Sequence, residues 1–335
     1  MKFRHILAPC LALMTATTAL AAEVNVYSYR QPELTAPLFD AFTEKTGIAV
    51  NVVFLKKGMV ERLKSEGKRS PADLAFTSDI GRLAELKAAG VTQAVAAGPL
   101  SATIPAEFRD PEGHWFGLTA RARVIYAARD RVGADEVTTY EDLADPKWKG
   151  RICTRSGTHS YNLALTAAMI ANHDAAYAET WLAGVKANLA RRPQGNDRAQ
   201  VKAIWAGECD ISIGNTYYMG AMLSNPEQKP WADAVRIEFP RFEGGGTHLN
   251  LSGVAMTGAA PNRDEALQLM AFLASETGQR LYAEAVFEYP VAPDVAPADL
   301  VAGWGTFTRD GAPLSEIARL RPDALKAVER VDFDQ

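Results

Sequence analysis

The amino-acid sequence predicts an α/β protein with two lobes, each a mixed and mostly parallel sheet flanked by helices, joined by a two-strand hinge. Expected strands and helices alternate in two successive series, which is typical of sheets with helices on both faces. A stretch of strand character without a long helix separates the two series and can carry the chain between lobes. At 335 residues, the chain is also longer than one hydrophobic core usually supports.

The first series of elements follows residue 21. Apolar residues recur at helical spacing through Leu34, Leu38 and Phe42, which predicts the buried face of a first helix. The other elements are indicated by β-branched or apolar runs, by Ser78 or Asp79 as a helix cap, and by glycines that end helices. We expect strands at 24–27, 48–55 and 73–76, and helices at 33–45, at 58–66 and from the cap at residue 78 or 79 to Gly90.

The second series follows two apolar strands, 115–118 and 123–127, with no long helix between them. Polar residues that can cap helix N-termini divide this part of the chain into elements. The elements are a helix at 140–143 capped by Thr139, a strand at 151–155, a helix opened by Thr158 or Ser160, a helix at 197–206 capped by Asn196, and a strand from Cys209.

A glycine-rich segment, 242–250, marks the return of the chain to the first lobe. It precedes an apolar strand at 251–257 and helices at 261–274 and 276–285. The returning strand is expected to join the first sheet. We therefore assign residues 22–123 and 249–298 to an N-lobe, and residues 124–248 and 299–335 to a C-lobe.

Residues 1–21 have the features of a secretory signal peptide. A basic start is followed by an apolar run from Ile6, and the segment ends in Ala19-Leu20-Ala21, an A-x-A cleavage pattern. Its removal changes the net charge from −4 to −6, because Lys2 and Arg4 leave with it. We expect a mature periplasmic protein, and a mildly acidic chain without a basic run is not expected to bind nucleic acid.

Two cysteines, Cys153 and Cys209, remain after this processing. An oxidising compartment permits a disulfide between them. Both fall on expected strands that the predicted topology makes neighbours, about 4.8 Å apart. A disulfide and two buried thiols are therefore both compatible with the sequence. Neither cysteine belongs to a C-x-x-C pair, so zinc and redox motifs are not indicated.

The stretch 209–220, CDISIGNTYYMG, concentrates the most informative chemistry of the chain. It predicts a buried strand, a turn and a helix start that carries Tyr217 and Tyr218. Neighbours in the first helical turn lie about 100° apart, and ligands bind at the carboxyl ends of strands in open α/β sheets. Two phenols at this place suit a hard trivalent cation. The alternative is one tyrosine in the core and one hydroxyl that caps the lobe.

The sequence predicts two α/β lobes, two passages of the chain between the lobes, and a signal peptide. Together these features predict a periplasmic solute-binding protein that closes like a hinge on its ligand. The chain also resembles the ferric-iron-binding periplasmic proteins of ABC transporters, which are family-1 extracellular solute-binding proteins. The resemblance extends through most of the chain after residue 21. It rests on VYSYRQP (26–32), SPADLAFTSDIGRL (70–83), WFGLTARARVIY (115–126), TYEDLADPKWKGRI (139–152), PQGNDRAQ (193–200), NTYYMG (215–220) and GTHLNLSGV (246–254).

The resemblance implies a set of site residues and partners. Tyr217, Tyr218 and Tyr161 match tyrosines that bind ferric ion in the family, and Arg121 matches an arginine near the metal in some members. Fe³⁺ would be the cargo, with a synergistic anion such as carbonate. The implied partner is an inner-membrane permease, and we expect the protein to be a monomer.

The chain departs from the family in its first lobe. Relatives often carry a His-Tyr pair after the first strand, and that tyrosine binds iron. The matching positions here are Gln31 and Pro32, and proline cannot coordinate a metal. The first lobe is therefore expected to contribute Tyr29, Gln31, water or a small anion.

Two other function classes compete with iron binding. The same fold could take an organic or inorganic anion, such as a phosphonate, or a thiamine-like cargo, with Arg121, Arg30 and helix N-termini as binding groups. An enzyme on this fold is not expected, because the sequence has no G-x-S-x-G motif and no carboxylate pair in a catalytic motif.

Overall fold

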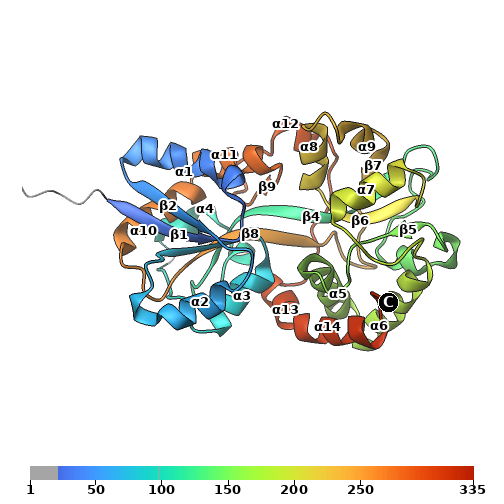
Figure 1. The fold of residues 1–335 in the computed structure, drawn as a ribbon, viewed down its shortest axis with the longest axis horizontal. Coiled ribbons are helices and arrows are strands. Elements are labelled where there is room, and N and C mark those ends of the chain that lie inside the picture. The colour runs from blue at the N-terminus through green and yellow to red at the C-terminus, as the bar shows by residue number, and fades with distance from the viewer. Residues whose placement is uncertain (1–21, 97) are drawn as a thin grey trace, which may run out of the picture.

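A computed structural model describes residues 22–96 and 98–335 of the chain (Figure 1). The signal peptide predicted at 1–21 lies outside these residues. The strand order is β2-β1-β3-β8-β4-β6-β5, and β7 and β9 also pair with β4. The strands are β1 (Glu23–Ser28), β2 (Ala49–Phe54), β3 (Leu74–Thr77), β4 (Phe116–Ala128), β5 (Ile152–Cys153), β6 (Ile211–Asn215), β7 (Val235–Glu238), β8 (Leu249–Met256) and β9 (Tyr289–Pro290).

The sheet is mixed, and its parallel pairs lie toward its two ends. β1 pairs in parallel with β2 and β3, and β5 pairs in parallel with β6. The central pairs, β3 with β8 and β4 with its neighbours, are antiparallel. The predicted two-lobed α/β fold with a mixed sheet is confirmed, and β4 and β8 are the strands that connect its two halves (Figure 1).

The two strands predicted at 115–118 and 123–127 are one continuous strand, which corrects the expectation of a break between them. β4 is 13 residues long and buried throughout. Its first part pairs with β8 as far as Ala122, and its second part pairs with β6 from Arg123 onward. Because side chains of a strand alternate between faces, Arg121 and Arg123 lie on the same face of β4.

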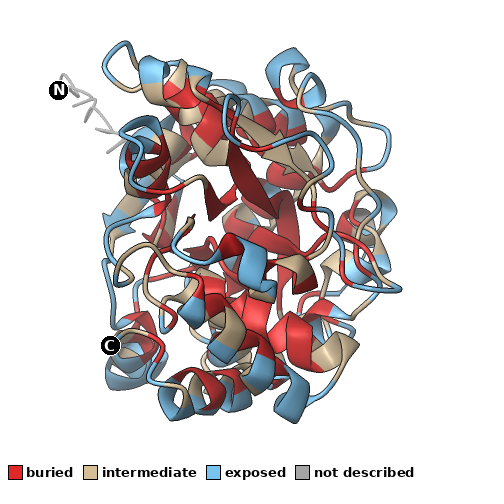
Figure 2. Ribbon diagram, turned by 90° about the vertical axis from the view of Figure 1, so that its right-hand side faces the viewer, coloured by how far each residue is buried: buried red, intermediate tan, exposed pale blue. Residues whose placement is uncertain are grey.

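Helices cover both faces of the sheet, and the buried residues gather on the strands and on the helix surfaces toward them (Figure 2). Among the described residues, none of the helices is long and apolar enough to cross a bilayer. The helices are α1 (Pro32–Thr46), α2 (Met59–Glu66), α3 (Ile80–Ala88), α4 (Gly98–Thr103), α5 (Ser160–Asn172), α6 (Ala175–Ala187), α7 (Asp197–Trp205), α8 (Tyr217–Leu223), α9 (Lys229–Asp233), α10 (Arg263–Ala274), α11 (Glu276–Val286), α12 (Asp299–Ala302), α13 (Leu314–Arg319) and α14 (Arg321–Arg330).

The helix caps agree with the sequence at some positions and differ at others. Asp79 caps α3 and Asn196 caps α7, each through a side-chain oxygen that accepts from a backbone N–H. The helix predicted at 140–143 is a 3₁₀ turn at Glu141–Ala144. The cap of α5 is neither Thr158 nor Ser160 but His159, whose Nδ1 accepts from the N–H of Tyr161.

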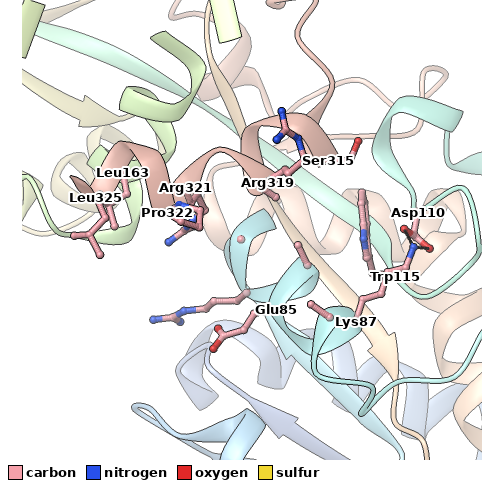
Figure 3. Close-up of a pocket in the computed structure, with 15 residues that line it drawn as sticks. Glu85, Lys87, Asp110, Trp115, Leu163, Ser315, Arg319, Arg321, Pro322 and Leu325 are labelled. Carbon is pink, nitrogen blue, oxygen red and sulfur yellow. Dashed lines mark hydrogen bonds and ion pairs between the residues drawn. The ribbon is translucent and has the colours of Figure 1, made fainter. Parts of the chain in front are cut away.

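The C-terminal helices α13 and α14 bridge the two halves of the molecule. α13 packs against α3 and α5. Arg321 of α14 forms an ion pair with Asp79, and its guanidinium occupies the space that a Cβ at Gly81 would need. A pocket of about 810 Å³ lies beside this contact, between α3 and the α13–α14 segment (Figure 3).

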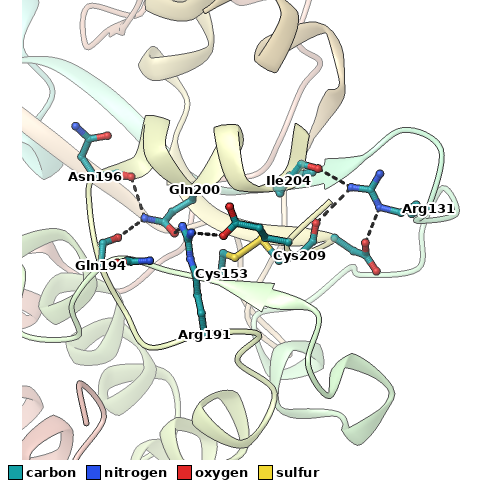
Figure 4. The surroundings of a disulfide bond; sticks show 10 residues. Arg131, Cys153, Arg191, Gln194, Asn196, Gln200, Ile204 and Cys209 are labelled. Carbon is teal, nitrogen blue, oxygen red and sulfur yellow. Dashed lines mark hydrogen bonds and ion pairs between the residues drawn. A yellow bond between two sulfur atoms is a disulfide. The ribbon is translucent and has the colours of Figure 1, made fainter. Parts of the chain in front are cut away.

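A disulfide joins Cys153 at the end of β5 to Cys209 just before β6, with the two Cα atoms 5.9 Å apart (Figure 4). Of the two possibilities left open by the sequence, the structure has the bridge. The cysteines are 56 residues apart in sequence, and closing a loop of that length stabilises the folded protein by about 4 kcal/mol. The disulfide therefore holds the start of β6, the strand that leads to Tyr217 and Tyr218, against β5.

Candidate functional site

Tyr217 and Tyr218 begin α8, directly after β6. Their rings are 4.1 Å apart between centroids. Thr216 occupies the N-cap position, but its hydroxyl accepts from the N–H of Ala122 instead of capping the helix. This bond ties the turn to β4. α8 also lies against Phe287, whose ring fills the place of a Cβ at Gly220, so only glycine fits there.

Tyr161 lies in the first turn of α5 and contacts Tyr217, which in turn packs against Tyr218. Its hydroxyl oxygen is 3.4 Å from that of Tyr217. His159 caps the helix and packs edge-on against the Tyr161 ring, with centroids 4.7 Å apart. The structure thus brings together the three tyrosines that the sequence singled out in the predicted C-lobe. We call Tyr161, Tyr217 and Tyr218 the tyrosine cluster.

Two phenols of this cluster, those of Tyr217 and Tyr218, resist ionisation in the metal-free protein. Burial, followed by the neighbouring phenols Tyr161 and Tyr218, raises the pKa of Tyr217 well above its ordinary value of 10. Burial is also the main cause that raises the pKa of Tyr218 to about 12, while Arg155 acts in the opposite direction. Both hydroxyls are therefore protonated at neutral pH until something replaces the proton.

Two arginines from the other half of the molecule approach the tyrosine cluster. The guanidinium carbon of Arg30 is 6.0 Å from the Tyr217 ring centroid, and that of Arg121 is 5.4 Å from the Tyr161 ring centroid. Arg30 forms a 2.6 Å ion pair with Glu288, which lies 4.0 Å from Arg121. The Nε of Arg121 is buried and has no partner among the described residues, so it can donate to a ligand oxygen.

Two further arginines, one on β4 and one shortly after β5, lie beside the ring of Tyr161. The guanidinium carbons of Arg123 and Arg155 are 5.9 Å and 5.3 Å from its ring centroid. Both pair with the fully buried Asp197, at 2.6 Å and 3.1 Å. Together with the pair at Glu288, four guanidinium groups and two carboxylates surround the cluster. The surroundings thus favour a negatively charged occupant.

The first-lobe residues proposed from sequence, Tyr29 and Gln31, form no hydrogen bond with the tyrosine cluster among the described residues. The Tyr29 hydroxyl accepts from the N–H of Met59 at the start of α2, and its ring lies 4.2 Å from the guanidinium carbon of Arg82. Gln31 is exposed, in the N-cap position of α1, and its side chain does not cap the helix. Pro32 is the first residue of α1, a position that suits proline.

Sequence reasoning overlooked Arg123, Arg155, Asp197 and Glu288. The first two had a usable signal. Arg123 begins the strand expected at 123–127, two residues after Arg121, and residues two apart on a strand face the same side. Arg155 ends the strand expected at 151–155, next to the predicted helix that carries Tyr161. Asp197 and Glu288 gave no such signal, because their roles depend on arginine partners 42 to 258 positions away.

The pocket of Figure 3 is near this site but separate from it. Its wall includes Leu163, two residues from Tyr161 on α5, and extends along α3 to Trp115. None of the described residues that line it belongs to the tyrosine cluster. The pocket therefore does not define the binding site.

The fold and the site define a two-lobed solute-binding protein with phenols where its halves meet. Residues 69–303 match the family described as bacterial extracellular solute-binding protein, and the chain belongs to that family. It is 42% identical to iron uptake protein A1 of Synechocystis sp. over 314 residues, which are 93% of this chain and 87% of that protein.

Solved structures of other proteins also resemble this chain in fold and in sequence. The apo ferric ion-binding protein A of Pasteurella haemolytica has a TM-score of 0.90 and 50% identity, over 94% of this chain and 99% of that one. A Trichodesmium protein in complex with iron and citrate ligands has a TM-score of 0.88 and 41% identity, over 93% of this chain and 100% of that one.

Proposed function

We propose that this protein captures ferric ion through Tyr161, Tyr217 and Tyr218 and delivers it to an ABC transporter. The observation that carries the proposal is the convergence of the three phenols, with 3.4 Å between the hydroxyl oxygens of Tyr161 and Tyr217. Two oxygens that each bind a small hard cation at about 2 Å are at most about 4 Å apart. This separation therefore fits two ligands of one ion.

The chemistry of the donors favours the ferric ion. It is a hard cation that prefers oxygen ligands, and three phenolates balance its charge. The surrounding guanidinium groups then favour an additional anion such as carbonate. Arg121, with its unpartnered Nε, is the proposed donor to that anion, and exposed Gln31 is a second candidate if the halves close on the cargo.

The family of the protein indicates its transport partner and its compartment. Extracellular solute-binding proteins of this kind serve ABC transporters, so the proposed partner is an inner-membrane permease. We propose that residues 1–21 direct the chain to the periplasm, and the disulfide is consistent with an oxidising compartment. The protein is proposed to act as a monomer and to carry its cargo without transforming it. Tyr29 is proposed to support α2 rather than to bind iron.

Titration with ferric citrate tests this function. Phenolate bound to ferric ion absorbs visible light by charge transfer, so one equivalent of iron should give a coloured protein, and a crystal should give an anomalous signal at the iron edge beside the tyrosine cluster. A protein that stays colourless but binds phosphonate or thiamine would support the anion-binding alternative instead.

Iron uptake should release protons. Because Tyr217 and Tyr218 are protonated at neutral pH, ferric ion must displace at least two protons when it binds. Apparent affinity should fall about a hundredfold for each pH unit of acidification, or tenfold per proton. The measurement counts protons released per iron at pH 7 in weakly buffered solution, with the protons that displaced citrate takes up added back. Release of fewer than two protons would contradict a site that contains both tyrosinates.

A further inference from the structure

Three buried charged residues lie beside the tyrosine cluster, and we call Arg123, Arg155 and Asp197 the Arg–Asp clamp. Asp197 is fully buried, and Arg123 and Arg155 are 2% and 8% exposed. One carboxylate oxygen of Asp197 accepts from Arg123 at 2.6 Å, and the other accepts from Arg155 at 3.1 Å. The clamp therefore carries one net positive charge in the protein interior.

The clamp contacts α5 and the end of β6, the strand that leads into α8. Arg123 donates to the side-chain oxygen of Asn162, the residue after Tyr161 on α5, at 2.6 Å. Asp197 accepts from the backbone N–H of Asn215, at the end of β6 and just before α8, at 3.1 Å. Asp197 itself is the first residue of α7. A change in the clamp thus acts on both α5 and the turn before α8.

A purely structural role does not explain this arrangement well. Burying three charges carries a large desolvation cost, and apolar residues of similar volume often stabilise a fold equally well. Both guanidinium groups of the clamp lie within 6 Å of one aromatic ring, that of Tyr161. Such an arrangement stabilises negative charge on the phenol more strongly than it stabilises the neutral ring.

We infer that the Arg–Asp clamp tunes Tyr161 as a metal ligand: Asp197 holds Arg123 and Arg155 beside the ring, where their charge stabilises the phenolate and weakens its donation of electrons to bound iron. Arg123, Arg155 and Asp197 are positioning residues in this proposal. The inference rests on the proposed function, because it concerns the ferric complex of the same tyrosines.

A spectroscopic consequence follows from the electrostatics. Positive charge beside a phenolate lowers the energy of its electrons, so more energy is needed to transfer one to the ferric ion. Loss of a clamp arginine should therefore move the charge-transfer band to longer wavelength. The same loss removes a positive charge that lies beside the ring of the bound ligand, and iron affinity at pH 7 should fall about tenfold or more, as is usual when a group that supports a ligand is removed.

Arg155→Gln tests the inference, with Arg151→Gln as the matched control. Arg151 lies on the same segment of the chain and also pairs with an aspartate, Asp210 at 2.6 Å, but its guanidinium packs over Trp148 instead of a tyrosine. Both variants lose one cation from an ion pair. Visible spectra and citrate competition of the two ferric proteins are compared with the parent.

The inference predicts a band at longer wavelength and weaker binding for Arg155→Gln, no shift for Arg151→Gln, and a return toward the parent band for Arg155→Lys. An unshifted band in Arg155→Gln would overturn it. If Arg155→Gln is too unstable to purify, Arg155→Met, which keeps the aliphatic stem, should show the same shift, and an unshifted band there counts against the inference equally. A parent protein that binds iron without a visible band would instead contradict the proposed function.

Discussion

Replacement of both Tyr217 and Tyr218 by phenylalanine is expected to abolish tight binding of ferric ion. The two side chains account for two of the three phenolates proposed to neutralise the metal. Each substitution removes only a hydroxyl, and the hydroxyl of Tyr217 has one hydrogen-bond partner among the described residues, Tyr161. The fold should therefore persist, and the loss should appear as the absence of the visible band.

The matched control for this double variant is Tyr177→Phe. Tyr177 is on α6 of the same half of the molecule, is 38% exposed and does not contact the tyrosine cluster. It should bind iron like the parent. Competition against citrate, with circular dichroism as a check on folding, measures all three proteins. A double variant that binds ferric ion as tightly as the parent would show that the site lies elsewhere.

Tyr161→Phe is expected to be far more damaging than Tyr29→Phe. Tyr161 meets Tyr217 at 3.4 Å, whereas the Tyr29 hydroxyl is already bonded to the N–H of Met59. Loss of Tyr161 should cost more than the about 10–100-fold typical for a residue that only supports a ligand. Loss of the Tyr29 hydroxyl should change affinity by less than about tenfold, or 1.4 kcal/mol.

The same comparison tests how the two halves share the metal. If the half that carries the tyrosine cluster supplies most of the ligands, iron binds there first. Closure then depends on weaker contacts of the other half, such as Arg30 and Arg121, because a ligand drives closure only through contacts that differ between the two states. If Tyr29→Phe and Tyr161→Phe lose equal affinity for ferric ion in a citrate competition, the ligands do not come mainly from the half that carries the tyrosine cluster.

Local signals in the sequence predicted much of the fold. Helical spacing and terminal glycines located α1 and α3, and alternation of strands and helices predicted the α/β class. The prediction of a break within β4 was wrong, because Arg121 interrupts the apolar pattern between the two expected strands and Arg123 begins the second of them. Both arginines are buried there because carboxylates and serines distant in sequence satisfy them.

Two members of the tyrosine cluster could be located from local sequence, whereas Tyr161, 56 positions before Tyr217, was indicated only by the family resemblance. Tyr217 and Tyr218 are adjacent, and their position after an apolar strand indicated a ligand site. The charges around the cluster could not be located in the same way. Glu288 and Asp197 come close to their arginines only through the order of strands and helices in space, which periodicity does not specify.

The path of the chain through the sheet has a consequence for how the protein folds. β8 lies between β3 and β4, and α14 packs against α5 and α6, so neither half is made from one continuous stretch of residues. An N-terminal fragment that stops before residue 249 would lack the strand that fills the centre of the sheet. Pairings between such distant segments form slowly, and the polypeptide must be almost completely synthesised before either half can reach its final structure.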